Sequence, residues 1–335
     1  MTNSSHSNVL IIGGGCAGIS VASRLHSLKS DLNISIIEPS DKSLYQAAWT
    51  LVGAGAYDVG STIKQMSEVM PSYVKWIKEY AEEFMPETNS IKTNNGTYTY
   101  DFLVVCPGLK LNFDGVAGLK EHLGKNNVCT NYSAEMATYT WECLKNLDGG
   151  TLLFTEPPMP IKCAGAPQKI AYLAADHLKK KGKLNESHLE FLCAKPVIFG
   201  VPHFQGPLNE VCDSYGIKRS FQHNLISVDG NSKEAVFKQS DKDGNTKEVT
   251  KKFDFIHVTP PQTSPDFIKN SPLADAGGWV DVDHKEGTLR HTKFENVYSL
   301  GDVMNAPNAK TGAAVRKQAP IVAHNIIKDI NKSSE

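Results

Sequence analysis

The sequence predicts an α/β protein of two domains, each built around a parallel sheet covered by helices. The chain has 335 residues, whereas one compact domain holds roughly 100–200. Two stretches share one order of elements: an apolar, β-branched run, a turn, and then a helical pattern. The first run covers 8–12 and its helix ends near Leu28, while the second run covers 151–154 and its helix spans 168–181. Continuous apolar runs are typical of parallel strands, because both of their faces are buried.

A glycine-rich turn separates the first strand from its helix, with Gly13, Gly15 and Gly18 in the spacing G-x-G-x-x-G. The first glycine allows the tight turn, the second lets the backbone approach a pyrophosphate, and the third permits close helix–strand packing. The next strand, 33–37, leads to Glu38, twenty residues after Gly18 (38 − 18 = 20). An acid at this distance accepts a hydrogen bond from a ribose hydroxyl. The pattern therefore predicts a three-layer, Rossmann-like domain that binds a dinucleotide of the FAD or NAD(P) type at a helix N-terminus.

The remainder of this domain has weaker signals. Residues 44–60 hold aromatic residues and glycines without a clear period, so we expect a loop that lines a cofactor. The pattern further predicts a helix over 64–70, strands over 74–77, 82–84, 98–105 and 278–282, and a turn over 88–96. The last strand, 297–300, meets Gly301 and Asp302, and a helix follows over 311–329. Asp302 suits the ribityl or pyrophosphate end of a flavin, and Lys310 with the helix N-terminus suits a reduced, negatively charged ring.

The second domain keeps the strand–turn–helix order but not the glycine turn. We assign 1–130 and 278–335 to the first, FAD-binding domain and 131–277 to the second, nucleotide-binding-like domain. The turn after the strand at 151 is Glu156-Pro157-Pro158-Met159-Pro160, and proline has no N–H with which to hold a pyrophosphate. We therefore expect this domain to have lost its nicotinamide nucleotide. Its other predicted elements are helices over 134–147 and 205–215, a strand over 189–199, and antiparallel strands over 225–236 and 249–258 joined by a charged tip at 240–245.

Cys163 lies on the turn that opens the helix of the second domain. Pro167 fits the first helical turn, where its missing N–H has no cost. The unpaired N–H groups of that turn favour an anion, and Lys162 adds a positive charge beside the cysteine. We therefore expect Cys163 to be held as a reactive thiolate. The competing interpretation of this spacing is a small packing thiol.

Composition narrows the classes of function. A net charge of −1 and a pI near 6.8 give no electrostatic basis for a nucleic-acid partner. The seven cysteines show neither CxxC nor Cys/His metal spacing, so we predict no metal site and a reducing compartment or a single redox pair. The sequence contains no run of eighteen apolar residues, so it predicts no membrane-spanning helix. Residues 1–8 have neither a secretory nor a transit-peptide pattern.

With these motifs in place, the chain resembles the sulfide:quinone oxidoreductase family of flavoproteins, in particular the branch that includes the mitochondrial enzyme. The resemblance covers most of the chain, and the stretch around Cys163 is its most specific part. It rests on the glycine turn with Glu38, on Tyr45-Gln46 with 49–55, and on 74–77, 161–170, 257–261, 278–283, Gly301-Asp302 and Lys310-Thr311.

The resemblance implies a cofactor, a reaction and a set of residues. The cofactor is FAD, sulfide is oxidised at a cysteine pair beside the flavin, and the electrons pass to quinone. Cys163 then carries a persulfide, whose sulfane sulfur goes to an acceptor. By the same resemblance, positions that hold FAD in the family correspond to Cys16, Ala17, Glu38, Gln46, Ala81, Asp266 and Asp302.

Two departures from the family pattern matter. The second redox cysteine is expected just after the Gly-Asp pair, where this chain has Val303 and Met304, so Cys129 becomes the candidate partner of Cys163. The C-terminal tail, which helps to shape the quinone pocket and lies on the membrane in the family, is expected to be shortened or absent. The family resemblance implies a peripheral location on a mitochondrial inner membrane or a bacterial cytoplasmic membrane. A cytosolic location is the alternative, because neither an anchor nor a presequence is visible.

Three functional hypotheses follow. The first is an FAD enzyme that oxidises sulfide through a persulfide on Cys163 and reduces quinone. The second is a flavoprotein that senses or carries sulfur on Cys163 without quinone turnover, which the apolar residue at Val303 favours. The third is an NADH:quinone-type flavin reductase, which the proline-filled turn at 156–160 disfavours.

Overall fold

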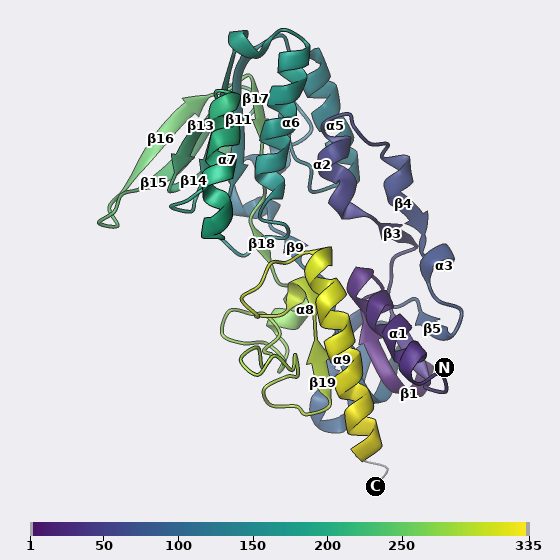
Figure 1. The fold of residues 1–335 in the computed structure, drawn as a ribbon. Coiled ribbons are helices and arrows are strands. Elements are labelled where there is room, and N and C mark those ends of the chain that lie inside the picture. The colour runs from purple at the N-terminus through teal and green to yellow at the C-terminus, as the bar shows by residue number, and fades with distance from the viewer. Residues whose placement is uncertain (1–2, 333–335) are drawn as a thin grey trace. The chain divides into compact units, whose positions relative to one another are not determined.

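The computed structural model describes residues 3–332, which form two units. The first unit takes the residues up to Leu44, Lys64–Lys110 and the residues from Thr263 onward. The second unit takes Tyr45–Ile63 and Leu111–Gln262. Each unit contains a parallel sheet with packed helices (Figure 1), so the predicted α/β fold class is confirmed.

The sheet of the first unit has the strand order β5-β2-β1-β8-β7-β6, and β19 also pairs with β8. Strands β5, β2, β1, β8 and β19 are parallel, whereas β6 and β7 run antiparallel to their neighbours. The strands are β1 (Asn3–Ile12), β2 (Ile34–Ile37), β5 (Val74–Ile77), β6 (Ala81–Met85), β7 (Ser90–Thr93), β8 (Gly96–Val105) and β19 (Val297–Ser299). The helices are α1 (Cys16–Leu28), α3 (Met66–Val69), α8 (Asp266–Lys269) and α9 (Gly312–Lys332).

The core of the first unit follows directly from its apolar runs. The end of β1 is buried on both faces, from Val9 to Ile12, as expected for a central parallel strand. Helix α9 places Val315, Ala319 and Val322 on one buried face, because residues three or four apart share a helix face. Helices α1 and α9 pack against each other beside the sheet (Figure 1). This layer fixes the turn that joins β1 to α1.

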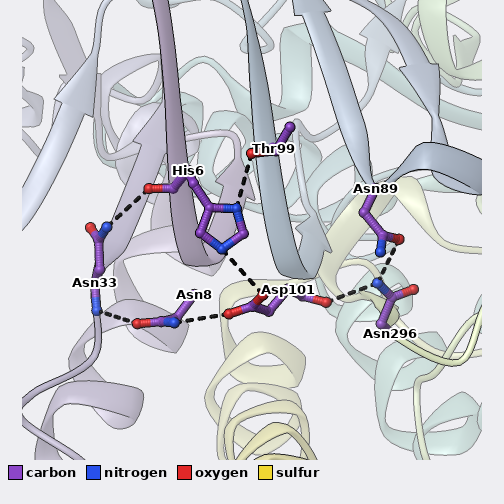
Figure 2. Close-up of polar contacts among 7 residues, drawn as sticks. All are labelled: His6, Asn8, Asn33, Asn89, Thr99, Asp101 and Asn296. Carbon is purple, nitrogen blue, oxygen red and sulfur yellow. Dashed lines mark hydrogen bonds and ion pairs between the residues drawn. The ribbon is translucent and has the colours of Figure 1, made fainter.

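A polar network links β1 to β8 near the beginning of the sheet (Figure 2). His6 Nδ1 lies 2.9 Å from Thr99 Oγ1, and His6 Nε2 lies 3.2 Å from an oxygen of Asp101. Asn8 donates to the other Asp101 oxygen at 2.8 Å and accepts from the backbone N–H of Asn33 at 3.0 Å. His6 stands opposite Thr99 in the parallel register. The network therefore supports the pairing that aligns β1 with β8.

The second unit has a parallel sheet of strand order β10-β17-β11-β12-β13 and an antiparallel sheet of order β14-β15-β16. Its strands are β10 (Val128–Cys129), β11 (Gly150–Glu156), β12 (Ser187–Cys193), β13 (Lys218–Phe221), β14 (His223–Asp229), β15 (Glu234–Ser240), β16 (Thr246–Lys252) and β17 (Phe255–His257). Its helices are α2 (Trp49–Val52), α4 (Leu119–His122), α5 (Ala134–Asn146), α6 (Ala166–Lys180) and α7 (Pro202–Ser214). Short strands mark the points where the chain passes between units: β3 (Lys42–Leu44), β4 (Ile63–Gln65), β9 (Lys110–Leu111) and β18 (Gln262–Thr263).

Alternating side chains give the second unit three layers. Leu152 and Phe154 of β11 belong to the core that includes the helix residues Ile170 and Leu178. Leu153, between them, belongs to the core with Phe237 and the antiparallel strands. Successive strand residues point to opposite faces, so the parallel sheet lies between the helical layer and the antiparallel sheet. Figure 1 shows α6 along one face of this unit.

Several predicted elements are wrong in detail. Residues 44–60 contain the short helix α2, whose Trp49 and Val52 are buried, and 88–96 contains strand β7. Helix α7 begins at Pro202, with Pro207 inside it. The stretch 225–236 is divided by a turn between β14 and β15, and 278–282 forms only isolated bridges. These errors share one cause: packing against other elements decided structure where the local pattern was weak.

Candidate active site

The glycine turn of the first unit has the geometry that the motif predicts. Gly13 has φ +104°, and a Cβ there would lie 2.5 Å from the carbonyl oxygen of Cys106. A Cβ on Gly18 would lie 1.9 Å from the carbonyl oxygen of Gly13. A Cβ on Gly15, by contrast, would meet no atom within 4 Å. Two glycines therefore permit close packing, whereas Gly15 borders open space at the start of α1.

Glu38 is held beside this turn by backbone donors. One carboxylate oxygen accepts from the N–H of Gly14 and the other from the N–H of Ser40, both at 2.8 Å. Trp76 Nε1 donates to the Glu38 carbonyl at 2.8 Å. Each carboxylate oxygen has a second lone pair, so Glu38 is oriented and still able to accept from a ribose hydroxyl. The open Gly15 backbone, the helix N-terminus and this acid together fit a dinucleotide.

Lys310 is buried in the first unit, near the end of β19. Its Nζ donates to the carbonyl of Asp302 at 2.6 Å and to the carbonyl of Met304 at 2.8 Å. The ammonium also lies 4.4 Å from the ring centroid of Trp279, a cation–π distance. Burial lowers the pKa of Lys310 to about 8, despite the carboxylate of Asp302. Lys310 thus stabilises the loop after Gly301 through two hydrogen bonds. It contributes a positive charge to the candidate cofactor site only while its amine is protonated.

The other predicted cofactor residues of the first unit differ in environment. Cys16 is exposed in the first turn of α1, and the next residue, Ala17, is buried in the core. Ala81 begins β6. Asp266 begins α8 and forms an exposed ion pair with Lys110 at 2.5 Å, which lowers the pKa of the carboxyl.

Val303 and Met304 are fully buried in the core of the first unit. They follow Gly301, whose N–H donates to Gln318 at 3.0 Å. Both apolar side chains pack where the family resemblance implies a redox cysteine.

In the second unit, Cys163 occupies the turn between β11 and α6. The thiol is half-buried, and its backbone has φ +53° in the left-handed region. This conformation costs a non-glycine residue about 1–2 kcal/mol. Its carbonyl accepts from the N–H of Ala166 at 2.7 Å, directly before α6, and Pro167 lies in the first helical turn as predicted. Surrounding contacts have to offset this strain.

Lys162 supplies those contacts. Its N–H donates to Gln262 Oε1 at 2.6 Å, and its carbonyl accepts from the Tyr132 hydroxyl at 3.5 Å. Its ammonium donates to Gln46 Oε1 and lies 5.9 Å and 5.6 Å from the ring centroids of Trp49 and Tyr132. The residue before Cys163 is thus held by both backbone and side chain. Gln46, predicted from the resemblance to hold FAD, is the polar partner of Lys162.

The cation beside the Cys163 sulfur is Lys169, which the sequence analysis missed. Its Nζ lies 3.7 Å from Cys163 Sγ. Lys162 had been expected in this role, but its ammonium is engaged with Gln46. One signal was present in the sequence: the first turn of α6 has no acid, and a lysine follows it. A cation near a helix N-terminus is unfavourable unless an anion is close.

Tyr132 links the Cys163 turn to other buried polar groups. Burial, and then the charge of Cys163, raises the pKa of Tyr132. His257 Nε2 accepts from the N–H of Asn131 at 3.0 Å, and burial lowers the pKa of this histidine to about 3. Glu156 is buried and pairs with Lys195 at 2.5 Å, and its burial raises the pKa of the carboxyl. The buried polar groups around Tyr132 therefore include a histidine that burial keeps neutral and a carboxyl paired with a lysine.

Cys129, the predicted partner of Cys163, lies at the end of β10 and is fully buried. It lies in the same core cluster as Cys143 of α5, and the two thiols shift each other's pKa. A role for Cys129 in the Cys163 chemistry remains a prediction.

Comparison with known proteins places this geometry in a family. A pyridine nucleotide-disulphide oxidoreductase family model matches residues 7–140. The mitochondrial sulfide:quinone oxidoreductase of Dictyostelium discoideum is 44% identical over 323 residues, which are 95% of this chain and 70% of the relative. That of Mus musculus is 39% identical, over 96% of this chain and 71% of the relative.

A solved structure shares the fold. The sulfide:quinone oxidoreductase from Aquifex aeolicus aligns with a TM-score of 0.83 at 24% identity, covering 98% of this chain and 77% of that one. No described helix is both long and apolar enough to cross a bilayer. The extent of identity with the two mitochondrial relatives decides the assignment: the chain belongs to the sulfide:quinone oxidoreductase family.

Proposed function

We propose that this protein is an FAD-dependent enzyme that oxidises sulfide at Cys163 and passes the electrons to quinone. The observation that carries the proposal is the Cys163 turn. A half-buried thiol, strained at φ +53°, has the Lys169 ammonium 3.7 Å from its sulfur. Strain of this kind persists where the surroundings hold it, and it is concentrated at functional sites.

The FAD site belongs to the first unit in this proposal. Gly13, Gly15 and Gly18 with Glu38 would hold the adenosine and pyrophosphate portion, and Asp302 with Lys310 would lie at the ribityl and ring portion. We assign 1–130 and 278–335 to this FAD-binding domain, and 131–277 to the domain that carries the redox cysteine. Bound FAD supplies a two-electron acceptor.

The chain's own residues hold and charge the sulfur. Cys163, as a thiolate beside Lys169, bonds to the sulfur of hydrosulfide, and that step releases one proton and two electrons to form a Cys163 persulfide. An acceptor of the nucleophilic class, such as a thiolate, sulfite or a second hydrosulfide, then attacks the outer sulfur. The Cys163 thiolate leaves unchanged. Because Val303 and Met304 are apolar and buried, we propose that the acceptor takes the sulfur directly from Cys163.

The test is anaerobic addition of sulfide to the purified yellow protein while the flavin absorption band is followed. Bleaching or a new long-wavelength band is expected, and Cys163→Ser should abolish it. Cys212→Ser, a buried thiol of the same unit, is the matched control and should respond like the unchanged protein. Return of the yellow band on addition of a soluble quinone completes the proposed cycle. A full response from Cys163→Ser would refute the role of this cysteine.

A second candidate is a flavoprotein that takes sulfur on Cys163 without turning over quinone. The buried pair Val303 and Met304 favours it, since neither can accept sulfur from Cys163. A sulfide response that quinone fails to reverse would favour this candidate. Bleaching by NADH without any sulfide response would instead support the NADH:quinone-type reductase, which the prolines of 156–160 oppose.

The proposed location is the mitochondrial inner membrane, with the protein attached peripherally, since the relatives are named mitochondrial. Cell fractionation followed by a carbonate wash tests this assignment. Recovery in the carbonate wash of the inner membrane supports peripheral attachment. Retention in the washed membrane contradicts peripheral attachment, and recovery in the cytosol contradicts the location.

A further inference from the structure

Two thiols of the second unit, fourteen residues apart in the sequence (143 − 129 = 14), belong to the same core cluster. Cys129 ends strand β10, and Cys143 lies within helix α5, which packs against that strand. Both cysteines belong to one buried core cluster, and each thiol is close enough to shift the pKa of the other. Two cysteines can form a disulfide when their Cα atoms lie about 4.4–6.8 Å apart. Neither cysteine belongs to the Cys163 turn.

The two cysteines have unequal surroundings. Cys129 is fully buried. Burial is the larger cause that raises the pKa of Cys129 well above its usual range, and interaction with the Cys143 thiol is the next. Interaction with the Cys129 thiol lowers the pKa of Cys143. The Tyr139 hydroxyl also lowers this pKa, whereas burial raises it. Tyr139 precedes Cys143 by four residues and so lies on the same face of α5. Cys143 is therefore the more acidic thiol of the pair, and Cys129 is the thiol that holds its proton more strongly.

Cys143 lines a pocket, whereas Cys129 is fully buried. The pocket has a volume of about 260 Å³ and is lined by Asn127, Tyr139, Glu142, Cys143, Asn146 and Leu147. This is below the roughly 300–1,000 Å³ typical of sites for drug-sized ligands. A small disulfide of amino-acid size fits such a volume. Glu142 is the one charged side chain of the lining, so a reagent without negative charge is favoured.

We propose that Cys129 and Cys143 form a redox-active dithiol that reduces a small, low-molecular-weight disulfide entering this pocket. The Cys143 thiolate attacks one sulfur of the disulfide, R–S–S–R, and one thiolate, RS⁻, leaves. Cys129 then loses its proton and attacks the Cys143 sulfur, which expels the second RS⁻. The two cysteines are oxidised to a disulfide, and the external disulfide is reduced by two electrons to two thiols.

The chain allows a direct test, because both cysteines fall in one tryptic peptide. Trypsin cleaves after Lys125 and Lys145, and the peptide 126–145 contains Cys129 and Cys143 and no other cysteine. The folded full-length protein is incubated anaerobically with cystamine, a small cationic disulfide, then quenched with acid, alkylated under denaturing conditions and digested. We expect the peptide to lose both alkylation sites together and to become lighter by two hydrogen atoms. The buried Cys193 and Cys212, which share the tryptic peptide 184–218 because Pro196 blocks cleavage after Lys195, are the internal control and should remain alkylated.

Single variants assign the order of attack. Cys129→Ser should retain a lasting mixed disulfide between Cys143 and the cysteamine moiety, and Cys143→Ser should leave Cys129 unmodified. Thermal unfolding of each variant checks its folding, and the unchanged protein decides the proposal by itself if a variant unfolds. The proposal is overturned if peptide 126–145 of the unchanged protein retains two free thiols at cystamine concentrations that oxidise Cys163. It is equally overturned if a mixed disulfide on Cys143 persists there, since Cys129 would then not act as its partner.

Discussion

Alanine at Gly15 and alanine at Gly18 should separate a glycine that serves the cofactor from one that serves the fold. A Gly18 Cβ would stand 1.9 Å from the Gly13 carbonyl oxygen, whereas ordinary contact begins at 3.4 Å. The backbone would have to move by about 1.5 Å (3.4 − 1.9). Overpacking of this kind costs about 3 kcal/mol at the upper end of its usual range. The better helix propensity of alanine returns about 1 kcal/mol.

The net loss for Gly18→Ala is therefore about 2 kcal/mol, and a domain of this size loses about 2–4 °C in Tm per kcal/mol. We expect Tm to fall by about 4–8 °C, with or without FAD. Gly15→Ala meets no atom within 4 Å, and its φ of −77° with ψ of −165° is allowed for alanine. Its poorer N-capping and its smaller unfolded-state entropy offset each other. We expect an unchanged Tm for its flavin-free form.

FAD binding should show the opposite order of effects. A methyl group on Gly15 fills the space where the pyrophosphate approaches the backbone, so we expect at least a tenfold loss of FAD affinity, about 1.4 kcal/mol. The assays are thermal unfolding of flavin-free protein by circular dichroism and titration of that protein with FAD by fluorescence quenching. Unchanged FAD affinity in Gly15→Ala would refute the placement of the cofactor at this turn. An unchanged Tm in Gly18→Ala would refute the packing argument.

Three further predictions concern the second unit. Lys169→Met should slow alkylation of Cys163 near neutral pH by up to about fivefold, which corresponds to the free energy of an exposed ion pair. Lys169→Arg keeps the positive charge and should retain the rate. Equal alkylation rates for the two variants would show that Lys169 does not act on Cys163. His257 is held neutral by burial with a pKa of about 3 against 6.5, so unfolding releases a group that binds a proton below pH 6.5. The free energy of unfolding should therefore fall by about 1.4 kcal/mol per pH unit as pH decreases from 6.5 toward 3. Urea unfolding of His257→Gln should show a smaller dependence on pH. An unaltered dependence would contradict the buried, neutral state of His257. Ser133 caps α5 by accepting a hydrogen bond from the Met136 N–H at 3.2 Å. Ser133→Ala should therefore lower the free energy of unfolding in urea by about 1 kcal/mol. Ser133→Asp keeps a side-chain acceptor and is the control.

Some features could be predicted from the sequence because their cause is local. The strand, glycine turn and α1 depend on residues close in the chain, as does the entry of Pro167 into α6. The family assignment also rested on contiguous motifs. Weak local signals were less informative: Trp49 and Val52 became buried in a helix within a stretch expected to be a loop, because their burial depends on partners far along the chain.

The sequence by itself determined the α/β class, the dinucleotide turn with Glu38 and the importance of Cys163, since each follows from spacing that backbone geometry enforces. Tertiary structure decided which cation and which thiol are neighbours. Lys169, rather than Lys162, lies beside the Cys163 sulfur, and Cys129 shares a core cluster with Cys143. The physical reason is that such contacts depend on side-chain direction and on the packing of α5 and α6 against the sheet, which sequence spacing does not specify.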